Sequence, residues 1–111
     1  MTIQTSARDA ALQVAIQGDI DHHSAERIRA AVDQAYRSAR CRDIRFDFSQ
    51  VQFMDSSGIG MLIGRYKLAE RNGGKVSISG LGENMAHLFR ISGLHKLIQT
   101  DHVQGGASRA Q

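Results

Sequence analysis

Apolar residues recur along this chain with two different spacings. Leu12, Val14 and Ile16 alternate with polar or small neighbours, which is the period of a strand with one buried face. The segment from Ile44 to Phe48 repeats this alternation. Between the two strands the spacing lengthens to three or four residues, which predicts a helix from a cap at Ser24 to about Ser38. Its expected buried stripe is Ala25, Ile28, Val32, Ala35 and Tyr36.

The second half of the chain repeats this succession of a strand and a helix. A helix after residue 55 is predicted to stop at Asn72-Gly73-Gly74, because glycine accepts the left-handed backbone that ends helices. The expected inner face carries Ile59, Leu62, Ile63, Tyr66 and Ala69. The expected outer face carries Arg65, Lys67, Glu70 and Arg71.

Shorter apolar segments complete the pattern. We expect strands at Thr2–Thr5 and Lys75–Ser79, a short helix at Glu83–Ile91, and a return to the core at Leu94–Ile98. Strands that alternate with helices predict an α/β fold with some parallel pairing. The 111 residues are expected to form a single domain, residues 1–111, with a core of about 3–100 and a flexible tail or weak helix over 101–111.

The turn before the second long helix carries the most distinctive chemistry. Asp55 is followed by Ser56 and Ser57, and Asp and Ser oxygens accept the first N–H groups of helices. Gly58 and Gly60 keep side-chain bulk away from this end. Helix N-termini favour anions, so a hydroxyl here can carry a phosphate without disrupting the fold. We refer to residues 55–60 as the serine corner.

Composition and charge narrow the class of protein. Hydrophobic residues make up 41% of the chain and the net charge is +3, values typical of a globular domain. Six arginines lie between Arg27 and Arg45, but aromatic residues do not interleave with them in the way that single-strand binders require. These arginines are better explained as parts of solvated helix faces than as a nucleic-acid-binding patch. With no apolar run near 18 residues and no signal peptide, we expect a cytoplasmic protein without a membrane partner.

Two enzymatic interpretations of the serine corner remain as alternatives. Gly58-x-Gly60-x-x-x-Gly64 resembles a dinucleotide-binding loop, but its spacing is one residue off and the next strand ends without an acid. The commoner role of Gly60 and Gly64 is close helix packing. A hydrolase with Ser56, a histidine and Asp21 is also conceivable, although the Gly-x-Ser-x-Gly motif is absent. A small nucleotide-binding or hydrolytic domain is therefore the alternative function.

A metal site is not expected. Asp21-His22-His23 are adjacent in sequence, and adjacent residues do not easily converge on one ion. Cys41 is the single cysteine, so it has no internal disulfide partner. We interpret the histidines as part of a polar loop before a capped helix, and we expect no cofactor.

Several blocks of the sequence together resemble a known family. Phe53-Met-Asp-Ser-Ser-Gly-Ile-Gly60, Gly64-Arg-Tyr-Lys67 and Gly18-Asp-Ile-Asp-His-His-Ser-Ala-Glu26 are similar to the anti-sigma factor antagonists. Further matches are Gly73-Gly74, Leu88-Phe89 and Ser92-Gly-Leu94. The resemblance covers about residues 8 to 100 and is strongest to the sporulation branch that acts on sigma-F. It implies a STAS domain, a small mixed sheet with helices packed mainly on one side.

The resemblance also implies a mechanism and a site. In this family the unphosphorylated antagonist binds an anti-sigma factor that is also a serine kinase, and so releases the sigma factor. ATP-dependent phosphorylation ends the binding, and a phosphatase of the PP2C type reverses it. The phosphorylated residue would be Ser56, and the chain would not be an enzyme. The expected partner-binding residues are Asp21, His22, Ser24, Asp55, Ser57, Gly58 and Ile59.

The two serines differ in their expected geometry. If Asp55 is the cap, Ser56 is the first helical residue and points outward. Ser57 would then turn toward the following turn, where its hydroxyl bonds locally and is a poorer acceptor of phosphate. Residue chemistry and the resemblance both favour Ser56.

Overall fold

The computed structural model describes residues 1–101, so the expectation for the C-terminal tail lies almost wholly outside the described residues. Strands and helices alternate as the sequence predicts. In the described range, no helix has the length and apolar character needed to span a bilayer. The elements are β1 (Thr2–Arg8), β2 (Ala11–Gln17), α1 (His22–Ser38), β3 (Asp43–Gln50), α2 (Ser56–Arg71), β4 (Val76–Ser79), α3 (Glu83–Ser92), the 3-10 turn η1 (Leu94–Lys96) and β5 (Gln99–Thr100).

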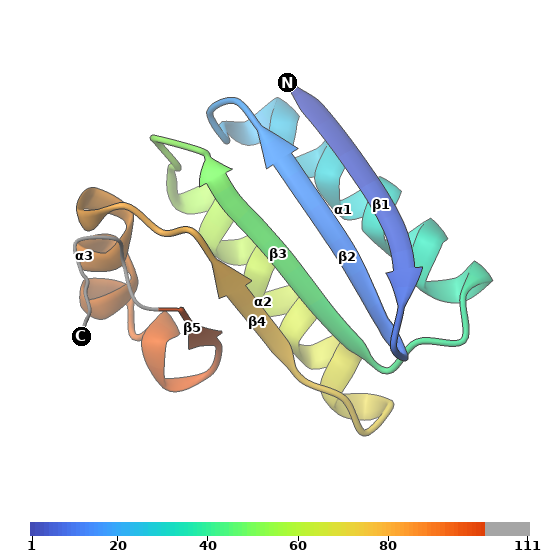
Figure 1. Cartoon of the computed structure of the whole chain (residues 1–111). Helices are drawn as coiled ribbons and strands as arrows, with labels where there is room; N and C mark the ends of the chain where they lie inside the picture. Colours follow the sequence, from blue (N-terminus) through green and yellow to red (C-terminus); the bar gives the residue numbers. More distant parts are fainter. Residues whose placement is uncertain (102–111) are drawn as a thin grey trace.

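The five strands form one mixed sheet in which spatial order follows chain order, β1-β2-β3-β4-β5. β1 and β2 form an antiparallel hairpin, whereas each later pair is parallel. Parallel neighbours need a crossover, and α1 and α2 provide two of them on the same face of the sheet (Figure 1). The expected α/β fold, with helices mainly on one side, is confirmed.

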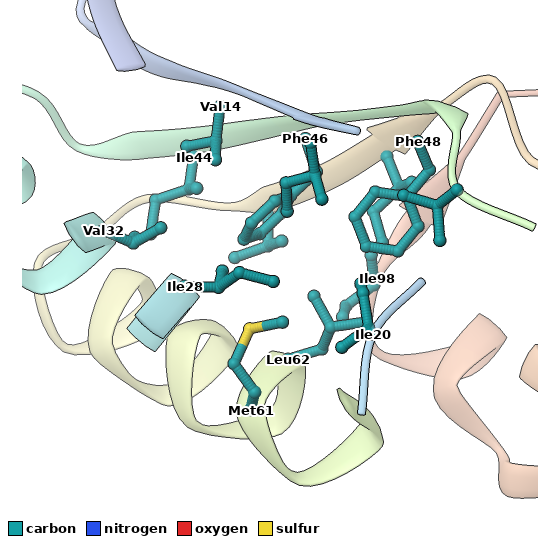
Figure 2. Packing of buried hydrophobic residues seen from close by; sticks show 14 of the residues in the cluster. Val14, Ile20, Ile28, Val32, Ile44, Phe46, Phe48, Met61, Leu62 and Ile98 are labelled. Carbon is teal, nitrogen blue, oxygen red and sulfur yellow. The ribbon is translucent and has the colours of Figure 1, made fainter. Parts of the chain in front are cut away.

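The core lies between the sheet and these two helices. Val14, Ile44, Phe46 and Phe48 extend from β2 and β3 toward Ile28 and Val32 of α1 and Met61 and Leu62 of α2 (Figure 2). The rings of Phe46 and Phe48 meet edge to face, with centroids 5.8 Å apart. Ile98 is also buried, which confirms the predicted return of the chain to the core. The short strand β5 was not predicted.

The start of α1 differs from the prediction. The N-cap is Asp21 and not Ser24. One carboxylate oxygen of Asp21 accepts the backbone N–H and the hydroxyl of Ser24, both at 2.9 Å. Ser24 is thus the third helical residue, whose N–H an N-cap side chain reaches. The helix begins three residues earlier than a Ser24 cap implies, and Ser24 is a buried residue of its first turn.

Arg65 also departs from its predicted position. It was assigned to the outer face of α2, but it is buried against α1, where its Nε lies 3.1 Å from Oδ1 of Asp33. Burial lowers the pKa of Arg65, and the charge of Asp33 acts in the opposite direction. Helix α2 therefore buries two sides, one against the sheet and one against α1.

The glycines of α2 have unequal roles. A Cβ at Gly58 would collide with the side chain of Met54 and closely approach Ile20, so this position requires glycine. A Cβ at Gly60 or Gly64 would meet nothing within 4 Å. The prediction that Gly60 and Gly64 allow close helix packing is therefore wrong, and Gly58 is the residue at which close approach occurs.

This difference predicts opposite effects of alanine at two neighbouring positions. Gly58→Ala overpacks the corner, which typically costs about 1–3 kcal/mol. Gly60→Ala adds a methyl group in open space and removes the helix penalty of glycine, so it should stabilise by up to about 1 kcal/mol. Urea unfolding of both variants measures the two changes. Equal changes of the same sign would contradict the packing described here.

Candidate functional site

The loops after β2 and β3 are tied together at the carboxyl ends of these strands. The N–H of Ile20 donates to the carbonyl of Phe53 at 2.9 Å, and the N–H of Asp55 donates to the carbonyl of Ile20 at 3.1 Å. These bonds extend the parallel pairing by an isolated bridge between Ile20 and Met54. Both side chains are buried, so the two loops are anchored in the core as well as to each other.

This pairing places two helix N-termini side by side. Asp21 follows Ile20 and caps α1, and Asp55 follows Met54 and caps α2. The carboxylate of Asp55 accepts the N–H of Ser57 at 2.8 Å. The two ends are linked directly, since the hydroxyl of Ser57 lies 3.5 Å from Nδ1 of His22. The serine corner and the start of α1 therefore form one continuous surface.

The structure separates the two serines clearly. Ser56 is the first residue of α2 and is exposed, as predicted. Ser57 is half-buried. We expected its hydroxyl to bond within its own helix. It instead faces His22, 35 residues earlier in the chain. Ser56 is therefore the more accessible of the two serines.

The other predicted partner-binding residues differ in how far they are exposed to solvent. Asp21 and His22 are exposed, and Asp55 and Ile59 are half-buried. Ser24 and Gly58 are buried. Ser24 acts by holding the carboxylate of Asp21. Gly58 acts by leaving room for Met54.

The two capping carboxylates, Asp21 and Asp55, contribute negative charge to this surface. The N–H and hydroxyl of Ser24 lower the pKa of Asp21, an effect that partial desolvation opposes and His23 reinforces. Asp21 is therefore ionised at neutral pH. The helix ends supply compensating positive potential. A phosphate on Ser56 would add charge to a surface that already carries the capping carboxylates.

Two observations refine the sequence-based analysis of this site. Phe53, two residues before Asp55, is 56% exposed. Sequence analysis did not single out Phe53 as a surface residue. The available signal was that this aromatic residue lies outside the alternating pattern of the strand before it. Within residues 1–101 the hydrolase arrangement is not assembled, because Asp21 bonds Ser24, and His22 faces Ser57 rather than Ser56.

Comparison with known proteins finds a matching family model and several proteins of similar sequence. The family model for the STAS domain matches residues 2–105. The anti-sigma F factor antagonist of Paenibacillus polymyxa is 33% identical over 98 residues, covering 88% of this chain and 84% of the relative. The anti-sigma-B factor antagonist of Bacillus subtilis is 36% identical over 88 residues, with 78% of each chain covered.

Solved structures share the same architecture. The Bacillus cell fate determinant SpoIIAA in its phosphorylated form is 27% identical, with a TM-score of 0.71 over 91% of this chain and 92% of that one. The five-stranded mixed sheet, the paired helix N-termini and the family match lead to one conclusion: this chain belongs to the STAS domain family.

Proposed function

We propose that this protein is an anti-sigma factor antagonist that acts as a binding protein under the control of phosphorylation, without catalytic activity of its own. The observation that carries the proposal is the exposed hydroxyl of Ser56 at the first position of α2, directly after the N-cap Asp55. Relatives that are 33% and 36% identical are anti-sigma factor antagonists, which supports the same role here.

The partner is an anti-sigma factor that is also a serine kinase. In the unmodified protein, Ser56, Asp21 and His22 form part of the docking surface, and docking releases the sigma factor. The kinase then transfers the γ-phosphoryl group of ATP to Oγ of Ser56; the hydroxyl loses its proton and ADP leaves. A phosphatase of the PP2C type hydrolyses the phosphoserine. Because this cycle of phosphorylation and dephosphorylation uses ATP, the protein acts in the cytoplasm.

Charge is the physical basis of the switch. Phosphorylation adds about −1.5 to −2 charges at neutral pH. The N-terminus of α2 tolerates this charge in the free domain, whereas a docked interface must desolvate it near Asp21 and Asp55. A loss of about 1.4 kcal/mol already weakens binding tenfold. Phosphorylation therefore ends binding without a change of fold.

The alternative is a small nucleotide-binding or hydrolytic domain. No specific contact in the described residues favours it, since Asp21, His22 and Ser57 are engaged as caps and a link between helices. Calorimetric titration of the isolated protein with ATP and GTP distinguishes the two functions. Binding stoichiometric with the protein would support the alternative.

Substitution of the two serines tests the proposed phosphorylation site. Ser56→Ala should abolish phosphorylation by the anti-sigma factor kinase encoded in the same genome and leave an antagonist that stays bound to it. Ser57→Ala should still be phosphorylated, because Ser57 is half-buried and faces His22. Ser56→Asp should bind weakly, although one carboxylate carries less charge than a phosphate. Mass spectrometry locates the phosphate, and calorimetry measures binding.

Two results would contradict this assignment. Phosphate on Ser57 with Ser56 unmodified would exclude Ser56 as the acceptor. Equal affinity of the kinase for the Ser56→Asp variant, the phosphorylated protein and the unmodified protein would exclude the charge switch.

A pH series tests the role of the Asp21 carboxylate. Asp21→Asn keeps a capping oxygen but removes the charge. The pKa of Asp21 is lowered by Ser24, so the carboxylate adds stability above its unfolded pKa of about 3.9 and loses it as the pH falls through the folded value. The stability difference between wild type and Asp21→Asn should therefore be constant down to about pH 5 and shrink below about pH 4. Urea unfolding at each pH measures this stability difference. Asp19→Asn, at an exposed position, is the control. If the stability of the two variants depended on pH in the same way, the role of the Asp21 carboxylate would be contradicted.

Phosphorylation should leave the backbone unchanged, because the capped corner accepts the charge at its surface. Amide chemical shifts of the phosphorylated and unmodified protein should differ near residues 20–24 and 53–60 and agree elsewhere. Large differences across β1, β4 and α3 would instead indicate a global rearrangement and count against the surface mechanism.

A further inference from the structure

An exposed aromatic ring lies next to the serine corner. Phe53 belongs to the loop between β3 and α2, and its side chain is 56% exposed. The backbone that carries the ring is fixed, because the carbonyl of Phe53 accepts the N–H of Ile20 at 2.9 Å. A single exposed apolar side chain is common on protein surfaces and needs no explanation. The surroundings of Phe53 therefore decide whether the ring has a role.

Phe53 lines a hollow of about 690 Å³ at the carboxyl ends of the central strands. The loop after β4 comes close to β3 here, since a Cβ at Gly80 would lie 2.7 Å from the backbone nitrogen of Ser49. The loop that carries Phe53 and the first turn of α3 form two sides of the hollow. The buried residues Val51 and Met85 also line it. The ring thus stands at a concave surface and not on an isolated projection.

The bridge between Ile20 and Met54 brings an acid next to this ring. Asp19 and Phe53 directly precede the two bridge residues, so they are neighbours across the same parallel pairing. Successive side chains of extended chains point to opposite faces, and both bridge residues are buried. Asp19 and Phe53 accordingly are both exposed, and both line the hollow.

The hollow has a negative charge that nothing in the domain neutralises. Glu83, the first residue of α3, supplies a second carboxylate. Neither Asp19 nor Glu83 has an ion-pair partner within residues 1–101, and no Lys, Arg or His of that range lines the hollow. The N-terminus of α3 contributes only about half a positive charge, which does not cancel two carboxylates. The hollow therefore favours a cation and repels ligands that carry phosphate, such as nucleic acids.

We propose that this hollow binds an arginine side chain of the anti-sigma factor kinase. A guanidinium stacks on an aromatic face through a cation–π interaction and forms directed hydrogen bonds with carboxylates. Arginine does both at once, because its charged group is planar. Phe53 provides the aromatic face, and Asp19 and Glu83 provide carboxylates that are exposed and unpaired within residues 1–101.

This inference rests on the proposed function. Phe53 precedes the N-cap Asp55 by two residues, so a kinase that reaches Ser56 also meets the hollow. Ser56 itself does not line the hollow. The arginine contact therefore gives the docked kinase a second point of attachment, beside the serine corner, and fixes its orientation.

Replacement of Phe53 separates a cation–π contact from a simple apolar contact. Phe53→Leu keeps an apolar side chain but removes the aromatic face, so affinity for the kinase should fall about fivefold. Phe53→Trp should bind at least as tightly as wild type, because tryptophan makes the strongest cation–π contacts. Calorimetry measures affinity, and urea unfolding should show little change in either variant, since the ring is exposed. A Phe53→Leu variant that binds as tightly as wild type would overturn the role of the ring.

Neutralisation of the two acids tests the charge. Asp19→Asn and Glu83→Gln should each weaken kinase binding by about a factor of three or more, because each removes one charge-assisted hydrogen-bond acceptor. Asp9→Asn is the matched control. Asp9 is an exposed acid in the turn between β1 and β2, at the opposite end of β2 from the hollow, and its replacement should leave the affinity unchanged. Equal losses in all three variants would indicate long-range attraction only and contradict a local pairing.

Isotope labelling of the arginine and lysine side chains of the kinase identifies the occupant directly. In the complex with wild type, the side-chain signals of one arginine should shift upfield, because an aromatic ring shields protons above its face. In the complex with Phe53→Leu, formed at saturating concentration, this shift should be absent. The inference is overturned if no arginine shows a shift that depends on the ring, or if a lysine shows it instead.

The outcomes separate the two proposals. If the kinase neither binds nor phosphorylates wild type, the proposed function fails, and the kinase is excluded as the occupant. If the kinase binds and phosphorylates wild type, and the Phe53→Leu, Asp19→Asn and Glu83→Gln variants bind equally well, the arginine site fails and the proposed function stands.

Discussion

The site depends on the short parallel pairing between the loops that follow β2 and β3. Hydrogen bonds from Ile20 and Asp55 continue the sheet past its regular strands and fix the bridge between Ile20 and Met54. Because each bridge residue directly precedes an N-cap, the same pairing determines where α1 and α2 begin. Gly58 completes the arrangement, since only glycine lets the first turn of α2 rest on Met54.

Much of this organisation could be predicted from the sequence. The strand period of β2 and β3 and the glycine stop of α2 are local signals, and both were predicted correctly. The cap at Asp55 was only assumed in comparing the two serines, and the structure has it. The start of α1 was not predicted correctly, because Asp21 and Ser24 are both good caps and their spacing alone does not show which one receives the hydrogen bond. Arg65 was misplaced because its neighbour Asp33 lies on another helix, and sequence periodicity does not determine how helices cross.

The domain combines a stable support with a surface that is not optimised for stability. The core side chains of the sheet and the two helices form one buried cluster. On the side of α2 that borders α1, by contrast, Gly60 and Gly64 leave open space, and two side-chain nitrogens of Arg65 have no hydrogen-bond partner in residues 1–101. Proteins commonly accept such losses where a surface must bind another molecule.

The order of the strands has a consequence for how the chain folds. Every pairing in the sheet joins strands that are consecutive in sequence, so each parallel pairing closes only the one crossover between its two strands. A smaller sequence separation between contacting residues favours faster folding. Both loops of the site belong to residues 1–71, as do both helices that follow them. During synthesis, the segments that build the corner have therefore all been made before β4. The later strands and α3 then add to an edge of the sheet that is remote from β1.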